Sequence, residues 1–165
     1  MKRLLILLVT LSCCLVSNAQ KEKDFASKFM EQFEYDTAVN CITVSPKMME
    51  QLTKNDLGKR EHLAEAIQKL KSARIITATQ NGEHYYQIAE ELLKKNSKRF
   101  SHVDKYQDKK NYGSFYSRKD KTGKTVELIL IHLDNKQNKL VVVNLTGDID
   151  EEFIASLSKN FHNQN

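Results

Sequence analysis

The chain has 165 residues, with 26 Lys and Arg against 21 Asp and Glu, three Cys, one Pro and no Trp. A domain of this length buries roughly 68–70% of its extended surface on folding, so a hydrophobic core can form without metal or disulfide support. The composition, 40% hydrophobic and 28% charged, excludes wholesale disorder, collagen, a disulfide scaffold and a multi-span membrane protein.

The first twenty residues have the three-part layout of a secretory signal peptide. A basic start at 1–3 precedes a mostly apolar run over 4–16, and the small residues Ser17 and Ala19 follow. The apolar run is shorter than the roughly 20 residues that a bilayer core needs. We therefore expect cleavage between Ala19 and Gln20.

The remainder of the chain is expected to form one exported domain. No linker, repeat or low-complexity tract follows residue 20, and no later apolar run approaches the length of a membrane span. The sequence predicts a signal peptide at 1–19 and a single domain at 20–165, with no transmembrane span in the mature chain. Its expected location is the periplasm or an envelope membrane.

The cysteines near the N-terminus offer an alternative to simple cleavage, in which a lipid anchors the chain to a membrane. Leu11 to Cys14 resembles a lipoprotein cleavage box with Cys14 as the acylated residue, but Cys13 stands where a small residue is usual. Simple cleavage is therefore favoured over lipidation. Cys41 is then the only thiol of the mature chain, and its apolar surroundings in the sequence predict a buried, inert side chain.

Hydrophobic spacing predicts the first half of the domain in chain order. Phenylalanines at every fourth position from Phe25 predict a helix, and β-branched residues over 38–44 predict a strand. Ser45-Pro46 is a helix start signal. Two short helices, to Leu52 and then over 63–70, precede a second strand over 73–79.

The second half begins with the clearest helical pattern and continues with strands. The pattern runs from Tyr85 to Leu93, and it is followed by strands near 99–107, 113–119, 124–133 and 139–146. Gly147-Asp148 is expected to end the last strand, and Asp148 or Asp150 to cap a final helix. These elements predict an α+β fold: a mostly antiparallel sheet of about six strands, with a C-terminal four-strand meander and helices packed on it. The apolar strands over 126–133 and 140–145 should be central.

Four segments together resemble a known family. They are the strand and helix start over 38–49, the strand over 74–77, and the apolar pair over 127–131 and 140–149, which closes in Thr-Gly-Asp-Ile. This pattern resembles the exported domain-of-unknown-function family 4252, which occurs mostly in Bacteroidetes. The resemblance implies a single domain and a cell-envelope address in a Gram-negative bacterium. Its motifs are structural, so it implies no catalytic residue or ligand.

The residues predict no catalytic, metal or cofactor site. The five histidines lack HExxH or zinc-finger spacing, and the acidic run from Asp148 to Glu152 lacks the EF-hand pattern. There is no Gly-x-Ser-x-Gly and no Gly-rich phosphate loop. Catalytic residues, metal ligands and cofactors are all expected to be none.

Charged residues are distributed unevenly along the chain. Residues 94–124 hold eleven Lys and Arg against three Asp, with aromatic residues between them. Basic side chains interleaved with rings can grip anions, whereas lysines on an edge hairpin can also serve only to discourage aggregation. The candidate binding residues are Lys105, Tyr106, Lys109, Lys110, Tyr112, Tyr116, Arg118, Lys119 and Lys121.

These observations favour a non-enzymatic binding or adaptor domain that presents a basic, Tyr-bearing hairpin to an anionic envelope partner. An acidic protein surface or a lipid headgroup fits that chemistry, and export argues against nucleic acid. The alternative is a small, hydrolase-like envelope enzyme whose site assembles only in three dimensions. A third hypothesis is a structural subunit with a broad apolar patch.

Overall fold

The computed structural model describes residues 23–56, 61–108 and 110–162. The predicted signal peptide over 1–19, cleavage at Ala19–Gln20 and acylation at Cys14 lie outside the described residues, as does Lys109. In the described part of the chain, no helix combines the length and the apolar character needed to cross a membrane.

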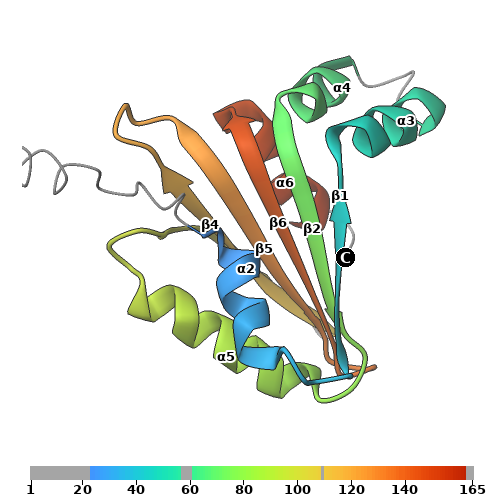
Figure 1. The fold of residues 1–165 in the computed structure, drawn as a ribbon, viewed down its shortest axis with the longest axis vertical. Helices are drawn as coiled ribbons and strands as arrows, with labels where there is room; N and C mark the ends of the chain where they lie inside the picture. The colour runs from blue at the N-terminus through green and yellow to red at the C-terminus, as the bar shows by residue number, and fades with distance from the viewer. Residues whose placement is uncertain (1–22, 57–60, 109, 163–165) are drawn as a thin grey trace, which may run out of the picture.

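Six antiparallel strands form one sheet in the order β1-β2-β6-β5-β4-β3 (Figure 1). The strands are β1 (Val39–Val44), β2 (Leu70–Ala78), β3 (Ser101–Gln107), β4 (Asn111–Lys119), β5 (Thr125–Asp134) and β6 (Lys139–Ile149). Strands β3 to β6 follow one another as the expected meander, and β5 and β6 occupy the centre. The predicted α+β class is confirmed.

Helices cover both faces of this sheet. They are α2 (Phe25–Met30), the 3-10 turn η1 (Glu31–Phe33), α3 (Pro46–Asp56), α4 (Glu61–Gln68), α5 (Gly82–Lys95) and α6 (Glu151–His162). Asp24 caps α2 by accepting a hydrogen bond from the Ser27 amide, and Asp150 caps α6 through the Phe153 amide. The predicted cap of the last helix is therefore Asp150 rather than Asp148.

The two faces bury separate hydrophobic clusters. Strand alternation directs Ile129 and Val142 toward α2 and α5, where Phe25 and Phe29 pack. The opposite face meets α6 and the α3–α4 pair. Its buried residues include Val44, Met49, Leu70, Phe115, Leu128, Leu145, Phe153 and Ile154.

Three local expectations need correction. Strand β2 begins at Leu70, although the hydrophobic spacing predicts that this residue ends the preceding helix. Strand β6 continues through Gly147 to Ile149, because a glycine at φ +149° lets the start of β2 approach: a Cβ there would lie 2.5 Å from the Lys69 carbonyl oxygen. Cys41 is exposed, because its strand lies at the sheet edge. Partial burial nevertheless raises the pKa of its thiol, which disfavours the reactive thiolate.

The phenylalanine stripe should dominate the stability of the α2 face. Phe29 is fully buried and stacks between Phe25 and Phe33, with ring centroids 5.8 and 4.9 Å away. We expect Phe29→Ala to lower the free energy of unfolding by about 3–5 kcal/mol, measured by chemical denaturation. Tyr35→Ala, at a side chain that is 92% exposed, is the control and should change it by less than about 0.5 kcal/mol. Similar losses for both variants would contradict this assignment.

Candidate functional site

The predicted basic hairpin divides into two groups at opposite ends of β4. Lys110 precedes the strand, whereas Lys119 and Lys121 lie at and beyond its other end. Nine residues of strand separate the two ends by about 25–30 Å. One compact ligand therefore cannot touch both groups. Arg118 belongs with the second group, and Lys105 is exposed on the neighbouring strand β3.

At the first end, two turns that are distant in the sequence meet. The Asn135 amide donates a hydrogen bond to the Lys110 carbonyl oxygen at 2.8 Å, which joins the β3–β4 turn to the β5–β6 turn. Lys136 and Lys139 are thereby brought to the same end of the sheet as Lys110, and all three are exposed. We call these three residues the lysine end. The sequence grouped lysines by proximity along the chain, so it missed Lys136 and Lys139.

The carboxylates at the lysine end hold the turns together. Asp108 accepts hydrogen bonds from the Lys110 and Asn111 amides, and these bonds lower the pKa of the Asp108 carboxyl. Asp134 accepts one from the Gln137 amide at 2.9 Å. Among the described residues, no carboxylate lies within ion-pair distance of a lysine-end ammonium group. Acidic charge is nevertheless close by, because Asp134 lies opposite Lys139 in the β5–β6 pairing and the charge of Lys110 helps to lower the pKa of Asp108.

At the opposite end, lysines pair with acidic residues near the end of β6 and the start of α6. Lys119 pairs with Glu151 at 3.6 Å and Lys124 pairs with Asp148 at 3.8 Å. Lys69 of the neighbouring loop pairs with Asp150 at 3.4 Å. These pairs are exposed and individually weak, and they supply acidic charge beside Lys69, Lys119 and Lys124, whereas Lys121 has no ion pair among the described contacts.

The predicted tyrosines anchor helix α5 to the sheet. Tyr112 donates a hydrogen bond to Glu83, and Tyr116 donates one to Glu90 at 2.9 Å. Burial, followed by these carboxylates, raises the pKa of both phenols. Tyr116 is only 8% exposed. The hydroxyl groups of these tyrosines are therefore occupied within the fold.

Tyr106 lies on the other face of the sheet and is 4% exposed. Its hydroxyl group is 2.5 Å from Nδ1 of His132. Nearby, the Asp104 carboxylate accepts hydrogen bonds from Ser158 and His162, which tie α6 to β3. Although burial opposes them, these bonds hold the pKa of Asp104 below its ordinary value.

Asp104, Ser158 and His162 are the residue types of a serine hydrolase in a different arrangement. Ser158 and His162 both bond to the same carboxylate oxygen, Oδ2 of Asp104. In a nucleophilic triad the histidine must contact the hydroxyl group that it activates. The observed contacts are those of a structural staple between α6 and β3.

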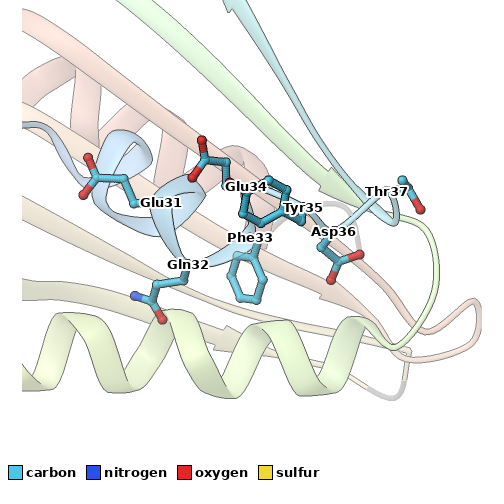
Figure 2. Close-up of a pocket in the computed structure, with 7 residues that line it drawn as sticks. All are labelled: Glu31, Gln32, Phe33, Glu34, Tyr35, Asp36 and Thr37. Atoms are coloured by element: carbon cyan, nitrogen blue, oxygen red, sulfur yellow. The ribbon is translucent and has the colours of Figure 1, made fainter.

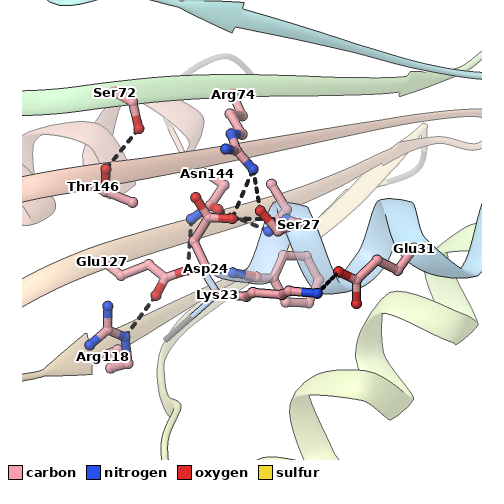
Figure 3. Close-up of polar contacts among 12 residues, drawn as sticks. Lys23, Asp24, Ser27, Glu31, Ser72, Arg74, Arg118, Glu127, Asn144 and Thr146 are labelled. Atoms are coloured by element: carbon pink, nitrogen blue, oxygen red, sulfur yellow. Dashed lines mark hydrogen bonds and ion pairs between the residues drawn. The ribbon is translucent and has the colours of Figure 1, made fainter. Parts of the chain in front are cut away.

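Arg118 is engaged by a buried carboxylate (Figure 3). Its Nε donates to Glu127 Oε2 at 2.7 Å, and Arg99 lies 3.7 Å from the same oxygen. Glu127 is fully buried, and its Oε1 accepts hydrogen bonds from the Phe25 amide and the Asn144 side chain. Arg118 is therefore part of the framework that holds α2.

A shallow pocket of about 490 Å³ lies along residues 31–37. Figure 2 shows Phe33 and Asp36 directed toward α5 and Glu34 directed away from it. Asp36 accepts a hydrogen bond from Tyr85 at 2.6 Å, which lowers the pKa of the carboxyl. This contact fixes the segment that leads into β1. No group of three His, Cys, Asp or Glu side chains in the described ranges could hold a metal ion.

Removing the buried charge should destabilise the fold. Glu127→Gln keeps the side-chain volume but leaves Arg118 and Arg99 without their anion. We expect a loss of about 3 kcal/mol in the free energy of unfolding, the low end for a broken buried ion pair, because Arg118 keeps some contact with water. Glu151→Gln, at an exposed ion pair, is the matched control and should lie within about 0.5 kcal/mol of wild type. Equal losses in denaturation experiments would contradict this role.

Stability should also fall as His132 becomes protonated. Burial lowers the pKa of His132 below 6.5, although Asp134 and Asp108 oppose the effect. As the pH falls, the unfolded chain therefore takes up this proton at a higher pH than the folded chain does. The contribution of neutral His132 to the free energy of unfolding is complete above pH 6.5 and is lost as the pH falls toward the folded pKa. His132→Gln should flatten the dependence of unfolding free energy on pH between 7 and 5. An unaltered slope in His132→Gln would refute this assignment.

Comparisons with known proteins identify the family of this chain but not its function. Among curated protein sequences, none matches this chain. Similar solved structures include the Ran-binding protein Mog1p of Saccharomyces cerevisiae and a mutant of Mog1, each with 14% identity and a TM-score of 0.30 over 54% of this chain and 56% of theirs. The chain thus spans little more than half the length of these structures.

A third similar structure is PA94 of Pseudomonas aeruginosa, described as a protein of unknown function and a candidate regulator. It has 7% identity and a TM-score of 0.36 over 78% of this chain and 82% of its own. A model of the domain of unknown function DUF4252 matches residues 33–157, which include all six strands. The chain belongs to the DUF4252 family.

Proposed function

We propose that this chain is an exported, non-enzymatic binding domain that meets an anionic partner in the cell envelope with its lysine end. The supporting observation is the contact between Asn135 and Lys110, which gathers lysines from two hairpins at one end of the sheet. Export is supported by the signal-peptide pattern over 1–19. The envelope of a Gram-negative bacterium, such as a member of the Bacteroidetes, is the environment that we propose.

The two ends of β4 differ in their ion pairs, and this difference favours the lysine end as the binding surface. The opposite end carries Lys119, which pairs with Glu151 at the start of α6, and Lys124, which pairs with Asp148 near the end of β6. At the lysine end, Asp108 and Asp134 bind backbone amides instead. An anionic partner therefore gains more by contacting Lys110, Lys136 and Lys139, because no described ion pair has to be broken.

The first test compares two charge-reversal variants of equal net charge. One carries Lys110→Glu, Lys136→Glu and Lys139→Glu, and the control carries Lys119→Glu, Lys121→Glu and Lys124→Glu. Binding to phosphatidylglycerol-containing vesicles is measured by co-sedimentation, with phosphatidylcholine vesicles as the neutral reference. Each lysine near an anionic surface contributes about 1 kcal/mol, so the first variant should bind roughly a hundredfold more weakly than the control.

A protein partner would be detected by photo-crosslinking in cells, from a benzophenone residue placed at Lys110 or, as a control, at Lys121. If an acidic protein is captured by the crosslinker at position 110 and not by the one at position 121, the proposal is supported and that protein is the partner. Equal losses for the two vesicle variants, together with no capture specific to position 110, would overturn it.

A further inference from the structure

The two edges of the sheet differ in how they are protected. Edge strand β3 carries Asp104 and Lys105, and a β-bulge interrupts its pairing between His102 and Asp104. Charges and bulges on an edge strand discourage pairing with another chain. The other edge strand, β1, has the sequence Val-Asn-Cys-Ile-Thr-Val, with no charge, no proline and no bulge in its pairing with β2. Its free edge therefore has none of these protections.

The exposure of β1 extends over both of its faces. Residues 40–43 are all exposed, and Ile42 is 59% exposed. Cys41 lies beside Ile76 on the face that carries α2, whereas Ile42 lies beside Ile75 on the opposite face. Within the described ranges, β1 pairs with β2 alone. An added strand could therefore bond to the free backbone edge and also cover Ile42.

We propose that two copies of this chain pair through β1, antiparallel and with Ile42 at the two-fold axis, so that their sheets join into one. This surface lies apart from the lysine end, so the proposal does not depend on the proposed function. A second copy supplies a strand that is equally uncharged, and an antiparallel two-fold pair buries the same patch from both sides.

The flanking charges favour the antiparallel direction between identical strands. Glu34 and Asp36 precede β1, and Lys47 follows it. Antiparallel pairing brings the acidic segment before β1 of one copy to the same end of the paired strands as Lys47 of the other, whereas parallel pairing would bring like charges to the same end.

Strand geometry restricts the register. Residues directly opposite each other in an antiparallel pair lie on the same face of the sheet. At the two-fold axis, one residue must therefore be directly opposite its own copy in the other chain. With Ile42 at the axis, the exposed isoleucines face each other and Cys41 faces Thr43. With Cys41 at the axis, each isoleucine would instead face Asn40. Apolar contact between the two Ile42 side chains selects the first register.

The pairing is short, because five paired residues are fewer than the 20–30 per side of a standard interface. We therefore expect a dimer that dissociates on dilution, and disulfide trapping is the suitable measurement. Residues directly opposite have Cα atoms about 4.5–5.5 Å apart, within disulfide range, whereas diagonal neighbours are about 7–8 Å apart, outside it.

The experiment places a single cysteine at each of three neighbouring positions in the full chain, in which Cys13 and Cys14 are replaced by serine. This parent protein keeps Cys41 on its described surface, and the other two variants add C41S/I42C or C41S/T43C. Mild oxidation is followed on non-reducing gels. Cross-linking through position 42 should be about tenfold faster than through positions 41 and 43, which are diagonal to their own copies.

A variant without an introduced cysteine provides the second measurement. Ile42→Lys places two ammonium groups at the axis and should make the chain monomeric in sedimentation experiments at concentrations where the wild type dimerises. Lys47→Ala should weaken the dimer less, and circular dichroism checks that both variants fold. A wild-type monomer at all concentrations, equal cross-linking at the three positions, or fastest cross-linking at position 41 would overturn the proposal.

Discussion

The buried carboxylate of Glu127 is the constraint on which much of this fold depends. A charged group without solvent contact needs counter-charges and hydrogen-bond donors, because the cost of leaving it unpaired is several kcal/mol. Arg118 and Arg99 supply the charge, and the Phe25 amide and Asn144 supply the donors. Glu127 thereby joins the three strands β4, β5 and β6 to the start of α2. Asp24 and Arg74 complete the same junction.

Tyrosine hydroxyl groups at the edge of the core are also paired with hydrogen-bond partners. Tyr112 and Tyr116 each donate to a carboxylate of α5, so the helix is held over the sheet by hydrogen bonds as well as by apolar contact. On the other face, Tyr106 and His132 form a pair within the sheet, between β3 and β5. Aromatic side chains with polar tips thus link layers at the edge of the apolar core. The tyrosines of the basic segment therefore serve the fold.

The lysine end and the edge of β1 are separate surfaces with different chemistry. One offers charge at the turns, and the other offers backbone hydrogen bonds and Ile42. If both proposals hold, antiparallel pairing of β1 directs the lysine ends of the two copies in opposite directions. Such a dimer would connect two anionic partners rather than place both lysine ends on one flat surface.

The sequence by itself determined the fold class, the element order and the central position of the apolar strands, because these depend on periodicity and local start signals such as Ser45-Pro46. It also identified which segment is basic. Only the tertiary structure decided that the basic segment divides between two ends of β4, and that Lys136 joins Lys110. Only the structure showed that Arg118 belongs to a buried cluster and that Cys41 lies at an exposed edge. Contacts across strands depend on the strand order and register of the sheet, which no pattern along the chain specifies.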